Sequence, residues 1–428
     1  MACFPHKFGN KINYKKQKMP EILTIIYLFY SFLGFYFLFL YSLVYVKNKR
    51  EIFSYPESSK DYSLSIVVPC YNEEKSIGET IEALLNLDYR GLKKIIVVDD
   101  CSTDNSFSVI KKYSQKYHNV IALKTPKNTG KAAGSKNFGA KFVDTELIGF
   151  VDADSYPQQD SVSKMIGFFD KKDVAAVTAC ILVKKKKTLI EKLQSIEYRI
   201  IVFSRKILGF LGAIYVTPGP LAIYRKSSFD KIGGFDEKNL TEDIEITWRL
   251  LSKNYQVEMC VPAKTYTTAP DKIKKWYNQR IRWNLGGLQT ISKYRKFFTK
   301  KGILGSFVLP FFLFTWVLGL LGIGILIYRG VKKIIVNYLI TKYSIEAQTA
   351  ILTLKDINLT PNILFFFGAL FLILNLSYML LALFYIKEKE FKNINLFTLS
   401  VYSLFYVLTY PFILITSLTR FIKNKKTW

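Results

Sequence analysis

Two aspartates one residue apart, Asp152 and Asp154, come directly after an apolar run at residues 147–151. Carboxylates at a turn can face one pocket, and such hard oxygen ligands suit Mg²⁺ or Mn²⁺ while leaving positions for phosphate oxygens. An Asp-x-Asp pair is weak evidence by itself, because aspartate is common in turns. The chain has only two histidines, however, so its chemistry must depend mainly on carboxylates.

Polar clusters also follow two other apolar runs. Residues 70–74 come after residues 64–68, and residues 99–104 come after residues 94–98. An aspartate at a strand end can accept hydrogen bonds from a base or a ribose, although Asp104 suits a helix N-cap equally well. Turns that merely end a strand would explain one such cluster better than three.

Three further segments are candidates for phosphate, proton or sugar chemistry. Residues 128–131 open a predicted helix whose backbone N–H groups could meet phosphate together with Lys131. Residues 241–243 begin a helix, and a helix start that faces a crevice can aim a carboxylate base, although acids are ordinary in a first turn. Residues 279–283 lie in the basic amphipathic stretch 272–296, which predicts a helix on the membrane surface with arginines for a diphosphate and an indole for a sugar.

These segments lie between alternating predicted strands and helices. The strands are predicted at residues 64–68, 94–98, 120–123 and 147–151, and the helices at residues 75–87, 106–117 and 131–143. Such alternation predicts an α/β fold with a mostly parallel, doubly wound sheet. In that architecture ligands bind beyond the carboxyl ends of the strands, which is where the polar clusters fall.

The chain of 428 residues is half hydrophobic, yet its net charge is +28. Its uncharged apolar runs are each long enough to cross a hydrocarbon core, which needs about 20 residues, and too long for ordinary buried helices. They lie at residues 22–46, 302–328, 362–386 and 397–419. We therefore expect a membrane protein.

The predicted organisation has six parts. They are a basic tail (1–21), a transmembrane helix (22–46), a linker (47–62), a cytoplasmic catalytic domain with interfacial helices (63–300), three transmembrane helices (301–420) with a mixed polar and apolar connection at about 329–361, and a second basic tail (421–428). The lysines are spread through loops without a nucleic-acid motif, so we expect no nucleic-acid partner and favour membrane lipid and an anionic substrate. The five cysteines form no CxxC pair and predict free thiols in a reducing compartment.

Several of these motifs occur together in one order. In that order the chain resembles the family 2 glycosyltransferases, especially the membrane synthases similar to cellulose, hyaluronan and poly-N-acetylglucosamine synthases. The resemblance covers about residues 63–300 and, in outline, the flanking spans. The motifs are residues 67–74, the pair Asp99-Asp100, Asn128 with Gly130 and Lys131, Asp152 with Asp154, residues 233–236, residues 241–243, and Gln279 with Arg282 and Trp283.

The resemblance implies a GT-A fold and a role for each matching residue. Asp243 would be the general base, beside Glu242, and Asp154 would ligate Mg²⁺ or Mn²⁺. The nucleotide-sugar donor would be bound by Pro69, Tyr71, Glu73, Asp100, Lys131 and Asp152. The diphosphate and acceptor would be bound by Gln279, Arg280, Arg282, Trp283 and Gly219. Pro220 departs from the small acceptor loop of relatives, because it stiffens the turn and lacks an N–H donor.

The implied reaction is a single inverting displacement on a nucleotide-sugar, by family resemblance a UDP-sugar. The acceptor is expected to be a growing polysaccharide, and the alternative is a single transfer to a polyprenyl-phosphate or glycolipid. Accessory membrane subunits are further partners to consider. An inactive nucleotide-binding scaffold is the non-enzymatic alternative, which the presence of Asp152, Asp154 and Asp243 disfavours.

The expected location is the cell membrane, with several spans and both termini outside. The positive-inside rule supports this topology weakly, because lysines also lie in both tails. The alternative is that residues 302–328 or 397–419 are interfacial or re-entrant, which would leave three true spans and a cytoplasmic C-terminus.

Overall fold

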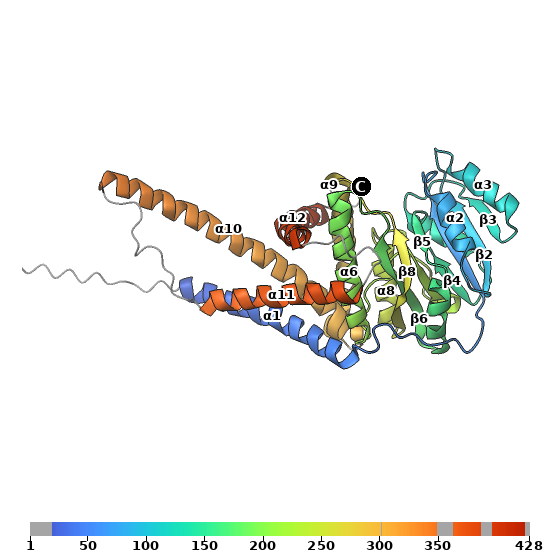
Figure 1. Cartoon of the computed structure of the whole chain (residues 1–428), viewed down its shortest axis with the longest axis horizontal. Helices are drawn as coiled ribbons and strands as arrows, with labels where there is room; N and C mark the ends of the chain where they lie inside the picture. Colours follow the sequence, from blue (N-terminus) through green and yellow to red (C-terminus); the bar gives the residue numbers. More distant parts are fainter. Residues whose placement is uncertain (1–18, 301, 349–362, 387–395, 424–428) are drawn as a thin grey trace, which may run out of the picture.

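The computed structural model describes residues 19–300, 302–348, 363–386 and 396–423. A sheet flanked by helices forms one end of the molecule, and long helices extend away from it (Figure 1). The predicted basic tails lie mostly outside the described residues, as does the part of the predicted connection at 349–361.

The sheet has eight strands in the order β3-β2-β1-β4-β7-β6-β8-β5. Their bounds are β1 Leu64–Cys70, β2 Leu92–Asp99, β3 Val120–Lys124, β4 Leu147–Phe150, β5 Ser155–Pro157, β6 Val174–Val183, β7 Ala222–Arg225 and β8 Gln256–Thr267. Strands β3, β2, β1 and β4 are parallel, whereas β7 is antiparallel to both neighbours and β5 is antiparallel to β8. The predicted mostly parallel α/β fold is confirmed.

The helices follow the order expected from the sequence in the first half of the domain. Their bounds are α1 Met19–Asn48, α2 Ile77–Leu85, α3 Ser106–Lys116, α4 Ala132–Ala140, α5 Ser161–Ile166, α6 Leu189–Gly209, α7 Lys226–Lys231, α8 Glu242–Ser252, α9 Ile273–Tyr294, α10 Leu309–Glu346, α11 Ile363–Tyr385 and α12 Leu396–Ile422. A π-helical turn, Leu304–Val308, precedes α10. The four predicted strands and three predicted helices of residues 64–151 are all present, with boundaries that differ by a few residues.

The central strands are buried on both faces, which explains their continuous hydrophobic sequence. All seven residues of β1 are buried. Because successive side chains of a strand point to opposite faces, Val67 joins the core on one face while Ile66 and Val68 join the core on the other. The first of these cores also contains Leu309 of α10 and Ala382 of α11. The sheet and the apolar helices therefore share one core.

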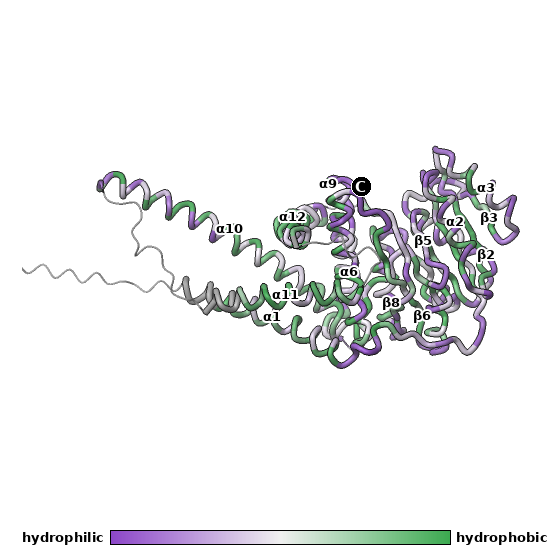
Figure 2. The backbone as a smooth tube through the Cα atoms, viewed as in Figure 1, coloured by the Kyte–Doolittle hydropathy of each residue, from purple (hydrophilic) through white to green (hydrophobic). Residues whose placement is uncertain are grey.

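Three helices are long and apolar enough to cross a membrane within the residues searched. They span Leu28–Asn48, Leu304–Glu346 and Phe397–Ile422, and Ala369–Tyr385 is a shorter apolar helix. Hydrophobic residues run along these helices in Figure 2. Helix α10 continues to Glu346, so residues 329–346 of the predicted connection are helical. Residues 331–340 keep apolar side chains at helical spacing, which lets the helix continue past the charged residues.

Candidate active site

A cavity of about 980 Å³ lies beyond the carboxyl ends of β1, β2 and β4, and is bordered by α6, α8 and α9. It brings together residues from segments far apart in the sequence. Every site residue predicted from the sequence lines it except Arg280: Pro69, Tyr71, Glu73, Asp100, Lys131, Asp152, Asp154, Gly219, Glu242, Asp243, Gln279, Arg282 and Trp283. The carboxyl ends of the strands and the start of α8 therefore lie around one cavity, as expected for this sheet topology.

Asp100 fastens the loop that precedes α4. Its carboxylate accepts hydrogen bonds from the backbone N–H of Thr129 at 3.0 Å and from the hydroxyls of Thr129 at 2.7 Å and Thr125 at 2.8 Å. Within that loop, Gly130 has a φ of +76°, a conformation that glycine adopts without strain. The structure thus gives Asp100 a positioning task that the sequence did not predict.

Lys131 connects the same loop to the segment before α8. Its ammonium donates to the backbone carbonyl of Lys238 at 2.9 Å and to that of Asn239 at 3.4 Å. The residue lines the cavity, but its side chain is engaged by protein carbonyl groups. A phosphate contact by Lys131 would require the ammonium to share or exchange these partners.

Lys136, which the sequence analysis missed, lines the cavity between two of the predicted site residues. Its side chain is only 3% exposed, and its ammonium lies 3.3 Å from Asp152 and 3.0 Å from Glu242. Burial opposes its charge, but these two carboxylates outweigh burial and raise the pKa of Lys136. The only available sequence signal was a lysine among small residues in α4, which does not reveal a bridge between β4 and α8.

The two acids at the start of α8 have different environments. Burial would raise the pKa of Glu242, but the neighbouring Lys136 outweighs it and the pKa of Glu242 lies below its ordinary value. Burial and the charge of Glu242 raise the pKa of Asp243 to about 6. The backbone N–H of Ile244 donates to Asp243 at 2.9 Å. Asp243 is thus the carboxylate whose pKa is closer to neutral, as general-base catalysis favours.

Asp154 lies among other acids. Burial, followed by the charges of Asp152 and Glu73, raises the pKa of Asp154 to about 7. A divalent cation would offset this repulsion, so the carboxylates fit Mg²⁺ or Mn²⁺. Within the described part of the chain, no three His, Cys, Asp or Glu residues are grouped to hold a metal. The remaining ligands would have to come from phosphate oxygens or water.

Gly219 supports Asp152 by close approach. A Cβ atom at position 219 would overlap the carboxylate of Asp152, and the backbone N–H of Asp152 donates to the Gly219 carbonyl at 3.1 Å. A larger residue would displace Asp152. The sequence analysis placed Gly219 in the acceptor loop, and the structure adds this contact with Asp152, which was predicted to bind the donor.

Arg280 does not line the cavity. Its side chain is buried, forms an ion pair with Glu197 of α6, and lies 4.1 Å from the ring centroid of Trp283. Its guanidinium also donates to the side-chain oxygen of Gln279 at 2.6 Å. Tyr406 of α12 donates to the same Glu197 at 2.6 Å. Arg280 therefore positions Gln279 and Trp283 instead of lining the cavity itself.

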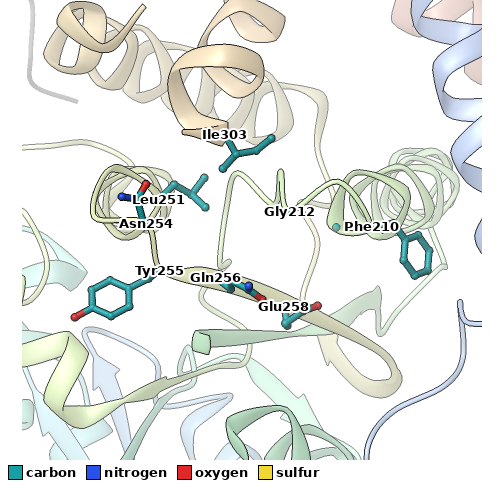
Figure 3. Close-up of a pocket in the computed structure, with 9 residues that line it drawn as sticks. Phe210, Gly212, Leu251, Asn254, Tyr255, Gln256, Glu258 and Ile303 are labelled. Atoms are coloured by element: carbon teal, nitrogen blue, oxygen red, sulfur yellow. The ribbon is translucent and has the colours of Figure 1, made fainter. Parts of the chain in front are cut away.

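A second, smaller cavity of about 360 Å³ lies elsewhere, near the end of α8 and the start of β8. Asn254, Gln256, Glu258 and Ile303 are among its lining residues (Figure 3). None of the residues predicted to act in the reaction lines it. The predicted site residues that line a cavity therefore line the larger one.

Comparisons with known proteins agree with the family resemblance seen in the sequence. The family model described as "Glycosyl transferase family 2" matches residues 65–233. A poly-beta-1,6-N-acetyl-D-glucosamine synthase of Staphylococcus epidermidis is 28% identical over 422 residues, covering 93% of this chain and 97% of that protein. The probable glycosyltransferase YdaM of Bacillus subtilis (strain 168) is 31% identical over 289 residues, covering 65% of this chain and 68% of that protein.

A solved structure shares the fold. It is the mannosyltransferase PcManGT from Pyrobaculum calidifontis, in complex with GDP-Man and Mn²⁺, and it matches with a TM-score of 0.59 at 16% sequence identity. The match covers 92% of this chain and 99% of that chain. The similarity therefore includes the helices that flank the sheet as well as the sheet itself.

Proposed function

Because the chain belongs to the family 2 glycosyltransferases, we propose that it is a membrane-bound, inverting enzyme that moves sugar from a UDP-sugar to a growing polysaccharide. The observation that carries this proposal is the position of Asp243. Its carboxylate, with a pKa raised to about 6, lines the same cavity as Asp152 and Asp154. The proposed base, Asp243, and the carboxylates proposed to bind the cation of the leaving diphosphate therefore line the same cavity.

The proposed reaction is a single displacement at the anomeric carbon. Asp243 accepts the proton of an acceptor hydroxyl while that oxygen forms a bond to the anomeric carbon. The bond from this carbon to the diphosphate oxygen breaks, and the nucleoside diphosphate leaves from the opposite face with the bonding electrons. One displacement inverts the configuration, and proton transfer to a base typically contributes about 10²–10⁴ in rate.

Charge on the leaving diphosphate would be stabilised by residues of α9 and by a cation. Arg282 is exposed, lines the cavity, and forms no ion pair with another described residue. Its planar guanidinium suits a diphosphate. Asp154, with Asp152, would hold Mg²⁺ or Mn²⁺, which supplies Lewis-acid stabilisation when it is bound. The nucleoside is proposed to be bound by Pro69, Tyr71, Glu73 and Asp100.

The polysaccharide acceptor is proposed from the relatives. Synthases named for poly-beta-1,6-N-acetyl-D-glucosamine match nearly the whole chain, which makes UDP-N-acetylglucosamine the first donor to test. Trp283, whose ring is partly exposed at the cavity, would stack on the acceptor sugar. Single transfer to a polyprenyl-phosphate or glycolipid is the alternative outcome.

The proposed location is the cell membrane, with residues 63–300 in the cytoplasm, where nucleotide-sugars are made. This location is supported by the three helices of the described residues that are long and apolar enough to span a membrane. Cys70, Cys101 and Cys260 are free thiols, as a reducing compartment favours. Accessory membrane subunits would be compatible with the exposed apolar helices.

The test is to incubate membranes that contain the chain with a panel of radiolabelled nucleotide-sugars. We expect label from one UDP-sugar to enter a water-soluble or insoluble polymer, in a reaction that needs a divalent cation. Label that partitions into organic solvent would identify the lipid-acceptor alternative. Membranes with Asp243→Asn are the matched control, and equal incorporation by both would overturn the proposal.

A further inference from the structure

Arg205 of α6 is a buried cation without an anionic partner. Its side chain is 6% exposed, and its Nε atom is buried without a hydrogen-bond partner. Among the described residues, its one charge-related contact is the ring of Tyr215, whose centroid lies 5.9 Å from the guanidinium carbon. Arginine cannot lose its proton in a protein, so burial without an anion is unfavourable.

The same residue lines the large cavity. Each of the other basic residues of the lining either has an oxygen partner or is exposed to solvent. Lys136 and Lys275 form ion pairs with carboxylates, and Lys131 donates to carbonyl groups. Arg282 is exposed. Arg205 is therefore the lining cation, within the described part of the chain, that is both buried and without an oxygen partner.

The position of Arg205 separates it from the proposed donor site. It lies on α6, next to the lining residues Ile201 and Val202. Tyr215, over which its guanidinium lies, packs against Phe312 of α10 with ring centroids 4.8 Å apart. Helix α10 is one of the helices that could span a membrane. This end of the cavity therefore adjoins the apolar helices, whereas Asp100 and Asp152 belong to the strand ends.

We propose that Arg205 forms an anion-binding subsite for a phosphate group on the first acceptor, and that this acceptor, on which the polysaccharide begins, is a lipid-linked saccharide. The proposal rests on the proposed function. The hydroxyl of the acceptor sugar would face Asp243, its phosphate would bind Arg205, and its hydrocarbon tail would leave along α10. A guanidinium forms charge-assisted, often bidentate hydrogen bonds with phosphate, which satisfies the unpartnered Nε.

The test compares three acceptors with the full chain in lipid nanodiscs. Farnesyl-phosphate-linked N-acetylglucosamine has the phosphate and the lipid, N-acetylglucosamine 1-phosphate has the phosphate alone, and octyl N-acetylglucosaminide has the lipid alone. We expect the first to have the lowest KM. A lowest KM for N-acetylglucosamine 1-phosphate would show that a soluble phosphate is the occupant and would overturn the lipid part of the proposal. A lowest KM for the octyl glycoside would overturn the whole of it.

Arg205→Gln removes the charge and keeps a polar side chain. We expect it to raise KM for both phosphate-bearing acceptors by about 10-fold to 100-fold, the range for hydrogen bonds to charged groups, and to leave KM for the octyl glycoside unchanged. Arg205→Lys keeps the charge and should retain part of the preference for phosphate. Lys192→Gln, on the exposed side of α6, is the matched loss of a cation and should change none of the three values.

Hydrolysis of the UDP-sugar without acceptor separates this inference from the proposed function. Wild-type chain that turns over no donor would overturn both. If donor hydrolysis is normal and Arg205→Gln changes none of the three acceptor KM values, the subsite alone is overturned. Arg205 would then be a cation that water solvates. If Arg205→Gln fails to fold, the ranking of the three acceptors by wild-type chain still decides.

Discussion

On the proposed donor side of the cavity, the site residues come from loops that directly follow β1, β2 and β4, whereas on the proposed acceptor side they come from α6, α8 and α9. The donor loops are fixed by hydrogen bonds between neighbouring loops of the sheet, such as those to Asp100 from Thr125 and Thr129, which lie 25 and 29 residues further along the chain. The acceptor side is fixed by contacts with distant segments. Arg280, Glu197 and Tyr406 belong to α9, α6 and α12.

This difference predicts where the enzyme depends on its long apolar helices. The donor side should keep its geometry as long as the sheet is folded. The acceptor side should respond to changes in α12, because Tyr406 shares Glu197 with Arg280. Lys136 joins the two sides, since it contacts Asp152 after β4 and Glu242 at the start of α8.

The largest effect is expected on the donor side, at the metal. Asp154→Ala should abolish transfer, because it removes the proposed cation ligand, and a chelator should abolish transfer by wild-type chain until Mg²⁺ or Mn²⁺ is restored. Transfer of labelled sugar measures both. Asp144→Ala removes an exposed carboxylate and serves as the control. Full activity of wild-type chain in chelator would contradict metal dependence.

The donor side was also the more predictable one from sequence. The apolar runs and the acids at their ends indicated the strands, and parallel strands bring their carboxyl ends to one edge. Recognition of the family from the order of these motifs was confirmed. Three features could not be predicted: the ion pairs of Lys136, the pairing of Arg280 with Glu197, and the lack of a partner for Arg205 among the described residues. Each is decided by how segments far apart in the chain pack together, and single-sequence patterns carry no information about such packing.

A smaller effect is expected at the residue that joins the two sides. Lys136→Met should lower turnover by about 10–100-fold, as loss of a supporting partner of a site typically does. Since the charge of Lys136 lowers the pKa of Asp243, its removal should also move the acid limb of the pH–rate profile to higher pH. A purely structural role would not shift that limb.

Two controls accompany Lys136→Met. Lys136→Arg keeps the charge and should leave the pH profile near its wild-type position. Lys141→Met removes an exposed lysine just after α4 and should not affect turnover. An acid limb that stays in place in Lys136→Met would refute the electrostatic link between the two sides.

The smallest effect is expected for the contact with α12. Tyr406→Phe removes one hydrogen bond to Glu197 and should raise acceptor KM by about 3-fold while donor hydrolysis stays unchanged. Tyr402→Phe is the matched control, because that neighbouring hydroxyl has no hydrogen bond with another described residue. Equal changes in transfer and donor hydrolysis would show that α12 does not specifically support acceptor binding.

The central claim is that Asp243 is the general base, and the pH dependence of kcat/KM tests it most directly. The base must be deprotonated to act, so wild-type activity should fall as the pH drops below about 6, the pKa of Asp243. Asp243→Asn keeps the size of the side chain but cannot accept the proton. We expect its turnover to fall by about 10²–10⁴ and its acid limb to disappear, with donor binding retained. Near-normal turnover in Asp243→Asn, or an unchanged acid limb, would contradict the account.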